Sequence, residues 1–260
     1  MQTQIIAFAN QKGGVGKTTT AINAAACLAE LGKKVLVIDL DPQANATSGL
    51  GVERVMGHSI YDALLGDVAI TDIIKQTSTP NLDIIPSELD LAGAEVDIAR
   101  RENYLHCMKE VLKPVTDAAE YDYMLLDCPP SLGILFMNAL TAAHSVIIPI
   151  QCEYYALEGL SVITGIIQQL AENGTNPELS LEGIVMTMYD ARTNLSRQVV
   201  REVNQHFGGV VYETLIPRSV RISEAPSHGV PVIEYDPSSF NALMFRRLAR
   251  EINKRVAARG

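Results

Sequence analysis

A glycine-rich segment at residues 10–19, Asn-Gln-Lys-Gly-Gly-Val-Gly-Lys-Thr-Thr, restricts the choice of fold more than any other part of the chain. It follows an apolar run over 5–9, typical of a buried parallel strand. It precedes an Ala- and Leu-rich stretch over 18–31, typical of a helix that ends near Gly32. A strand, a glycine-rich turn and a helix N-terminus together bind anions through backbone N–H groups. The sequence therefore predicts a phosphate site at the start of an α/β fold.

Each position of this loop suits contact with the phosphates of a nucleotide. Its glycines allow positive φ angles and close backbone approach. Lys17 can reach the β- and γ-phosphates, and the Thr18 hydroxyl can ligate Mg²⁺. The residues expected to contact the nucleotide are Lys12, Gly13, Gly14, Val15, Gly16, Lys17, Thr18 and Thr19.

The loop departs from the usual Gly-x-x-x-x-Gly-Lys-Thr pattern in two ways. Gln11 stands where the first glycine is expected, and a second lysine, Lys12, precedes the glycines. This is the deviant form of the Walker A motif. Lys12 lies too early in the loop to do the work of Lys17, so it requires a separate explanation.

Length and composition favour one domain over residues 1–260. The chain is 260 residues long and 47% hydrophobic, which suffices for one large core of an open α/β sheet. No window approaches 18 consecutive apolar residues, and a strand begins at residue 4, so we expect neither a signal peptide nor a membrane span. The four cysteines are scattered, which favours reduced thiols in a cytoplasmic protein.

Charge is distributed unevenly along the chain. The net charge of −9, taken alone, argues against nucleic acid as a partner. Residues 201–260, however, hold nine Lys or Arg against six Asp or Glu, which leaves −12 on residues 1–200. Such asymmetry is typical of a polyanion-binding surface, although a helix with solvated basic residues gives the same pattern. The candidates for such a surface are Arg218, Arg221, Arg246, Arg247 and Arg250.

Apolar strands alternate with helices throughout the chain, which predicts a doubly wound, mostly parallel sheet flanked by helices. Further strands are expected over 34–40, 82–86, 123–127, 145–150, 181–188 and 210–214, with an edge strand over 230–233 that contains Pro231. Helices are expected over 59–65, 88–112, 157–172, 193–206 and 239–257. Ligands of such sheets bind at the carboxyl ends of the strands.

Three aspartates lie at those strand ends. Asp127 follows the apolar run 123–126, the Walker B pattern, in which a carboxylate supports Mg²⁺ through a coordinated water. Asp39 and Asp41 close the second strand, and Pro42 fixes the backbone after Asp41. We expect Asp41 to lie at the mouth of the phosphate site and to orient the attacking water. The alternatives are a strand-end turn residue for Asp127 and a helix-capping or loop acid for Asp41.

These segments together resemble the ParA/Soj chromosome-partitioning ATPases, a family of P-loop NTPases. The resemblance runs in family order over nearly the whole chain, from residue 4 to about 236. The matching blocks are Lys12-Gly13-Gly14-Val15-Gly16-Lys17-Thr18-Thr19, Asp39-Leu40-Asp41-Pro42-Gln43-Ala44-Asn45, Asp127-Cys128-Pro129-Pro130-Ser131, Thr187-Met188-Tyr189-Asp190-Ala191-Arg192-Thr193 and Ile216-Pro217-Arg218-Ser219-Val220-Arg221-Ile222-Ser223-Glu224-Ala225-Pro226.

The resemblance implies a role for each motif. Lys12 matches the signature lysine that crosses an ATP-sandwich homodimer and contacts the phosphates bound by the partner subunit. Asp41 matches the acid used in hydrolysis, Asp127 the Walker B acid, and Pro217 a position that lines the adenine pocket. Arg218 lies, with Arg221, in a block where the family carries basic residues for non-specific binding of double-stranded DNA.

The resemblance also implies a function. We expect an ATPase that uses ATP and Mg²⁺, dimerises with ATP, associates with the nucleoid and partitions a chromosome, or a plasmid, with a centromere-binding partner of the ParB type. Slow turnover suits such a switch. Relatives that repress an operator carry an N-terminal DNA-reading extension. The first strand here begins at residue 4, so we do not expect operator-specific repression.

Three other readings share parts of this pattern. A MinD-like ATPase that cycles on membranes would end in an amphipathic helix with large apolar residues. Here the final turn is Val-Ala-Ala-Arg-Gly, so we expect the stripe of the last helix to pack on the sheet and no stable membrane binding. That stripe comprises Phe240, Leu243, Met244, Leu248, Ile252 and Val256. A redox protein like the nitrogenase iron protein would need a cysteine spacing that is missing, and a binding protein without turnover stays open.

Overall fold

The computed structural model describes residues 2–259 and contains one seven-stranded sheet with the order β3-β4-β2-β5-β1-β6-β7. All neighbouring strands are parallel except β3, which runs antiparallel to β4 at one edge. This arrangement confirms the predicted mostly parallel α/β sheet. The strands are β1 (Gln4–Phe8), β2 (Val35–Asp39), β3 (Lys75–Gln76), β4 (Leu82–Ile85), β5 (Tyr123–Asp127), β6 (Ser145–Gln151) and β7 (Ser180–Thr187).

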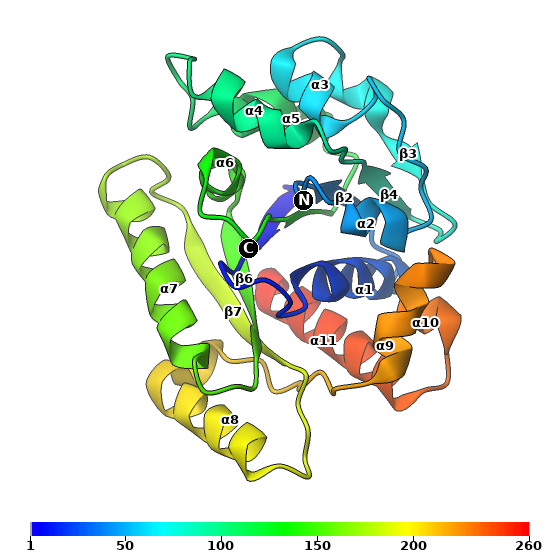
Figure 1. Cartoon of the computed structure of the whole chain (residues 1–260), viewed down its shortest axis with the longest axis vertical. Helices are drawn as coiled ribbons and strands as arrows, with labels where there is room; N and C mark the ends of the chain where they lie inside the picture. Colours follow the sequence, from blue (N-terminus) through cyan, green and yellow to red (C-terminus); the bar gives the residue numbers. More distant parts are fainter. Residues whose placement is uncertain (1, 260) are drawn as a thin grey trace.

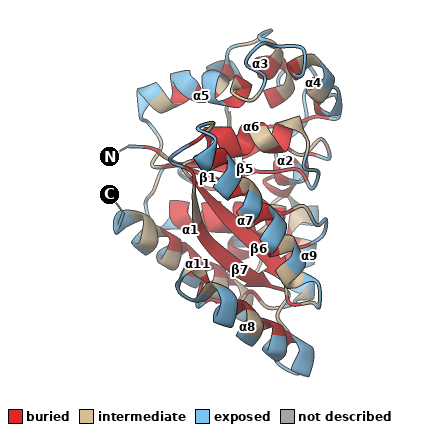
Figure 2. Ribbon diagram, turned by 90° about the vertical axis from the view of Figure 1, so that its left-hand side faces the viewer, coloured by how far each residue is buried: buried red, intermediate tan, exposed pale blue. Residues whose placement is uncertain are grey.

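Helices cover both faces of the sheet (Figure 1). One face packs against α3 (Ile60–Leu65), α4 (Leu91–Ile98), α5 (Cys107–Ala118), α6 (Ile134–Ala142), α7 (Ala156–Glu172) and α8 (Asn194–Phe207). The other packs against α1 (Lys17–Glu30), α2 (Asn45–Gly49), α9 (Val220–Glu224), α10 (Val232–Tyr235) and α11 (Phe240–Ala257). Figure 2 shows the consequence, a buried sheet between helices whose outer sides are exposed.

Alternation along the strands builds the two cores. In β1, Ile5 and Ala7 belong to the cluster under α3–α8, whereas Ile6 and Phe8 belong to the cluster under α1 and α11. Successive side chains of a strand point to opposite faces, so a strand covered by helices on both sides must be apolar at every position. This explains why the strands read as continuous apolar runs in the sequence.

The stretch 88–112, predicted as one helix, forms two. Helix α4 ends at Ile98, and α5 begins at Cys107. Between them lies the run Arg-Arg-Glu-Asn at 100–103, whose side chains are exposed. Four consecutive polar residues leave a helix no apolar side to bury there, so the prediction of a continuous helix was wrong.

Two predicted strands near the C-terminus were also wrong. Within 210–214, only Val211 pairs with the sheet, through one isolated bridge to Ile184 of β7. The segment 230–233 is not an edge strand, because Pro231 precedes helix α10 and its carbonyl accepts from the N–H groups of Glu234 and Tyr235. Proline is favourable at a helix start, where its missing N–H costs nothing. The short antiparallel strand β3 was not anticipated from the sequence.

The stripe of α11 is only partly buried. Leu248 and Ile252 lie in the core cluster that includes Ile6 of β1, as predicted for packing on the sheet. Phe240 and Leu243, near the start of the helix, remain 63% and 50% exposed. Among residues 2–259, no helix combines the length and apolar character needed to cross a membrane.

Candidate active site

The glycine-rich loop connects β1 to α1 at the carboxyl edge of the sheet. Gly14 and Gly16 have φ angles of +74° and +86°, which only glycine adopts at little cost. Gly13 does not use a positive φ, so the conformational argument holds for two of the three glycines. Gly16 also approaches β7, because a Cβ atom there would lie 3.8 Å from the Thr187 side chain.

Two polar side chains hold the loop in place. Asn10 donates from Nδ2 to the Pro149 carbonyl at 2.8 Å and accepts the Lys12 N–H at 3.0 Å. Thr187 donates from Oγ1 to the Val15 carbonyl at 2.7 Å and also lies 3.0 Å from the Ile150 carbonyl. These contacts tie the loop to β6 and β7. Sequence reasoning assigned no positioning role to either residue, because their partners lie more than a hundred residues away or on another strand.

A cavity of about 500 Å³ opens beside the loop. Lys17 is buried, and burial lowers the pKa of its ammonium, an effect opposed by the nearby Asp127, Cys128 and Asp41. The cavity brings several predicted residues together, since its lining includes Gly13, Gly14, Gly16, Lys17, Thr18, Thr19 and Asp41. A buried ammonium among backbone N–H groups and facing a cavity suits a polyanionic ligand.

Two carboxylates meet behind Lys17. Asp127 of β5 is directly opposite Asp39 of β2, and both side chains are fully buried. Asp39 is satisfied, since its carboxylate accepts hydrogen bonds from Asp41 and Thr47. Burial raises the pKa of Asp39 to about 6, against the effect of these hydrogen bonds.

Asp127 lacks such partners. Among the described residues, neither of its carboxylate oxygens has a hydrogen-bond partner of normal geometry. Burial, and then the charge of Asp39, raise the pKa of Asp127 well above its ordinary value, and the nearby Thr18 hydroxyl and Lys17 only partly oppose this. Orphaned carboxylate oxygens beside a threonine hydroxyl are the hard oxygen donors that a hydrated Mg²⁺ prefers. The residues at this place therefore fit the predicted metal.

The surroundings of Lys12 differ from those of the buried Lys17. Its side chain is 45% exposed and does not line the cavity in the described part of the chain. Its Nζ lies 2.8 Å from Oε2 of Glu153, in the loop after β6, and Gln151 donates to the other oxygen of Glu153 at 2.5 Å. The second lysine of the loop thus reaches a carboxylate of its own chain at the surface.

A second cavity, of about 300 Å³, continues from the first. The two cavities share Gly16, Thr19 and Met188 as lining residues. Pro217 lines the second cavity and follows Ile216, whose N–H donates to the Met186 carbonyl of β7. The position predicted for the adenine pocket is therefore next to the phosphate loop.

The five predicted DNA-binding arginines do not form one group. Arg218 and Arg247 line a third cavity, of about 610 Å³, together with Arg192. Arg192 was not among the predicted residues, although it lies in the loop after β7 that matched the family. Its side chain is 88% exposed.

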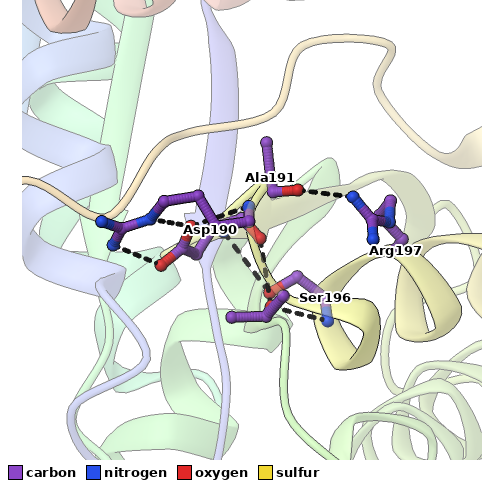
Figure 3. A network of polar contacts seen from close by, with 6 residues as sticks. Asp190, Ala191, Ser196 and Arg197 are labelled. Atoms are coloured by element: carbon purple, nitrogen blue, oxygen red, sulfur yellow. Dashed lines mark hydrogen bonds and ion pairs between the residues drawn. The ribbon is translucent and has the colours of Figure 1, made fainter.

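Hydrogen bonds order the loop that carries Arg192. Arg192 donates from Nε and Nη2 to the carboxylate of Asp190 at 2.9 and 2.7 Å, which holds the pKa of Asp190 down at about 2. Figure 3 shows this loop, in which the Asp190 N–H faces the Ser196 hydroxyl and Arg197 donates to the Ala191 carbonyl at 2.7 Å. A structured loop presents its arginines at a lower entropic cost than a mobile one.

The other predicted arginines are placed differently. Arg246 makes a bidentate ion pair with Glu30, with distances of 2.7 and 2.9 Å, which links α11 to α1. Arg221 lies near Glu224 and stacks over the Tyr235 ring. Arg250 is exposed on α11. The guanidinium of Arg246 is engaged inside the molecule, which makes it the weakest of the candidates.

Known proteins share this fold. A family model described as "AAA domain" matches residues 3–181. Cobyrinic acid a,c-diamide synthase from Mycobacterium smegmatis, solved with a bound ATP analogue and magnesium, superposes with a TM-score of 0.86 at 35% identity over 99% of this chain and 97% of that one. The septum site-determining protein MinD from Pyrococcus horikoshii OT3, complexed with Mg-ADP, gives 0.80 at 28% identity, with 99% of both chains covered. The fold and the site define a P-loop nucleotide-binding protein of the ParA/MinD class.

Relatives with similar sequences show to which family within this class the chain belongs. The sporulation initiation inhibitor protein Soj of Bacillus subtilis (strain 168) is 52% identical over 250 residues, covering 96% of this chain and 98% of the relative. The chromosome partitioning protein ParA of Myxococcus xanthus (strain DK1622) is 50% identical over 254 residues, covering 97% and 88%. The chain belongs to the ParA/Soj family of chromosome-partitioning proteins, as its motifs had indicated.

Proposed function

We propose that this protein is an ATPase switch of one domain, which dimerises when it binds ATP, binds DNA without sequence preference and drives the partitioning of a chromosome. The observation that carries the proposal is the contrast between the two lysines of the loop. Lys17 is buried beside its own cavity, whereas Lys12 is half-exposed and outside the lining of that cavity. A cation placed in this way can reach phosphates bound by a second copy of the chain.

The two joined cavities accommodate ATP. Its phosphates fit the loop and Lys17, and its adenine fits the second cavity beside Pro217. Thr18, and Asp127 through a water, would hold Mg²⁺, which neutralises charge on the phosphates when bound. The solved relatives with ATP analogue or ADP and magnesium support this assignment.

Asp41 is the residue proposed to position water for hydrolysis. It lines the phosphate cavity, and no covalent intermediate with the protein is required. The oxygen of the attacking water forms a bond to the γ-phosphorus while the bond to the β,γ-bridging oxygen breaks, which gives ADP and phosphate. Lys17 in its own subunit, and Lys12 from the second copy, stabilise the negative charge of the transition state.

A group of arginines near the start of α11 is the proposed DNA surface. Arg192, Arg218 and Arg247 line one hollow, and Arg250 lies one turn further along α11. Contacts between arginines and phosphates give an affinity that is independent of sequence and decreases steeply with salt. This surface would place the ATP-bound dimer on the nucleoid, where a centromere-binding partner of the ParB type stimulates hydrolysis.

Light scattering with ATP, with ADP and without nucleotide tests the switch. Wild-type protein should dimerise only with ATP, and Lys12→Ala should stay monomeric while still binding nucleotide. Lys113→Ala is the matched control, because Lys113 is also an exposed lysine paired with a carboxylate, that of Asp117 at 2.8 Å. An ATP-dependent dimer of Lys12→Ala would falsify the proposal.

Gel shifts on DNA of random sequence test the surface. Binding should require ATP, weaken with salt and be lost in the Arg192→Ala/Arg247→Ala double variant, because neither of these arginines lines the two cavities assigned to ATP. Arg100→Ala serves as control. The Arg100 side chain is 77% exposed and follows the end of α4, outside the cavity lined by Arg192. Binding that is indifferent to ATP or to salt contradicts the proposal. Co-sedimentation with liposomes in the presence of ATP would instead favour the MinD-like alternative.

A further inference from the structure

A closed ring of hydrogen bonds surrounds the backbone of Asp41. On one side, the Asp41 N–H donates to Oδ1 of Asp39 at 3.2 Å. The other oxygen of Asp39 accepts from the Thr47 hydroxyl at 2.7 Å, and that hydroxyl accepts the Ser87 N–H at 3.0 Å. The Ser87 hydroxyl donates to the Asp41 carbonyl at 2.8 Å and closes the ring.

Three separate elements supply the ring. Asp39 is the last residue of β2, Thr47 lies in α2, and Ser87 follows β4, which pairs with β2 in the sheet. All three side chains are at most 1% exposed, so water does not compete for their hydrogen bonds. Asp41 itself is only half-buried and faces the phosphate cavity.

We propose that Asp39, Thr47 and Ser87 are positioning residues that hold the Asp41 carboxylate at the place where it orients the attacking water. The inference rests on the proposed role of Asp41 in hydrolysis. The ring holds the Asp41 backbone at both its N–H and its C=O. Among residues 2–259, the Asp41 carboxylate accepts one hydrogen bond, from the Gln43 N–H at 2.9 Å, and Asp41 lines the cavity.

The ring acts on the chemical step and not on nucleotide binding. None of its three residues lines the phosphate cavity, although the lining includes, besides the loop and Asp41, the neighbours of Thr47 in α2, Asn45, Ser48 and Gly49. A displacement of about 1 Å at a catalytic group lowers the rate by about 100-fold. Loss of one hydroxyl leaves the rest of the ring, so we expect about a tenfold decrease in kcat for a single variant.

Steady-state hydrolysis of radiolabelled ATP over a range of ATP concentrations is the test. Ser87→Ala and Thr47→Val should lower kcat about tenfold, with KM for ATP and ATP-dependent dimerisation changed by less than about twofold. Thr47→Ser should restore the rate, because it returns the hydroxyl. In a double-mutant cycle, Ser87→Ala should have no further effect once Asp41→Ala has removed the carboxylate.

A structural role alone gives a different pattern. Thr141→Val is the matched control, since Thr141 is 1% exposed and its hydroxyl donates only within α6, to the Met137 carbonyl at 2.9 Å. This variant should keep the wild-type kcat. The inference is overturned if Ser87→Ala raises KM and leaves kcat unchanged, or if Thr47→Ser is as slow as Thr47→Val. It is also overturned if Ser87→Ala slows the Asp41→Ala protein by the same factor by which it slows the wild type. Unchanged hydrolysis in Asp41→Ala alone would instead refute the proposed function.

Discussion

Each end of the sheet buries a carboxylate, but the two carboxylates have different neighbours. At the carboxyl end, Asp127 lies beside a second acid, Asp39, and its oxygens have no normal hydrogen-bond partner among residues 2–259. At the amino end, Glu182 of β7 is 1% exposed. Its Oε2 pairs with Arg259 at 2.6 Å, while its Oε1 has no hydrogen-bond partner among residues 2–259. Nearby, Arg255 stacks 4.1 Å from the centre of the Tyr212 ring.

The two ends differ in whether the buried carboxylate has a counter-charge in direct contact. Arg259 already supplies the charge that Glu182 requires, although burial still raises the pKa of Glu182. Asp127 has a like charge as its neighbour, and the Thr18 hydroxyl and Lys17 only partly offset the rise in its pKa. A buried acid paired with a guanidinium therefore indicates a structural role. A pair of buried acids, one of which has no partner for either oxygen, indicates a place for a cation.

Replacement of Asp127, the acid at the carboxyl end, should have the largest effect: activity should decrease while stability increases. Asp127→Asn should lower kcat for ATP by about 100-fold or more, because transition-state charge loses the support of the metal site. Without ligand at pH 7.5, the same variant should be more stable than wild type by about 1 kcal/mol, because a buried like-charge pair is relieved. Activity assays and urea unfolding measure the two effects. A less stable Asp127→Asn protein would show that the carboxylate has a structural partner.

Removal of the partner at the amino end should have the reverse result. Arg259→Ala leaves Glu182 buried without its counter-charge and should reduce the free energy of unfolding by about 2 kcal/mol, less than for a fully buried pair because Arg259 is 46% exposed. ATP hydrolysis per folded molecule should not change. Urea unfolding of Arg259→Ala, Glu182→Gln and the double variant checks this. Equal stability of all four proteins would mean that the pair contributes nothing.

Local motifs account for what the sequence could predict of the site. The glycines and Lys17 are contiguous, and Asp127 follows an apolar run, so both could be placed on a strand end without knowledge of the pairing. The ring around Asp41 could not be predicted, because Ser87 and Thr47 meet only through the pairing of β2 with β4. Serine and threonine occur in many loops, and nothing in their spacing marks these two.

The long elements of the fold could be predicted from the sequence, and the short ones could not. Long apolar strands such as β2 and β6 were found because both faces of the sheet are covered, which makes every position apolar. The errors concern the break between α4 and α5, the two-residue strand β3, and two segments near the C-terminus, where Pro231 precedes a helix and Val211 makes one bridge. At these places tertiary contacts decide the structure and local preference is weak.

A half-buried histidine at the amino end provides a pH test of the comparison. Nδ1 of His144 accepts the Ile5 N–H at 3.0 Å, which requires the neutral ring. Burial lowers the pKa of His144 below 6.5, with Glu178 opposing and Lys109 adding to the shift. The stability it contributes is present above pH 6.5 and is lost as the pH falls through the lowered value. Between pH 7.5 and 5.5, urea unfolding should therefore show a larger loss of stability for wild type than for His144→Gln. Parallel losses would contradict the assignment.

The exposed ion pair between Lys12 and Glu153 should give the smallest effect. Both side chains are more than 40% exposed, so the pair is worth at most about 1 kcal/mol. If it holds Lys12 away from a second copy, Glu153→Gln should tighten the ATP-dependent dimer by up to about fivefold. Light scattering over a concentration series measures this, with Asp117→Asn as control because it breaks another surface lysine–carboxylate pair, a more exposed one on α5. A weaker dimer of Glu153→Gln would mean that Glu153 itself contributes to the contact between copies, and the cis pair with Lys12 would then be a resting position without a restraining role.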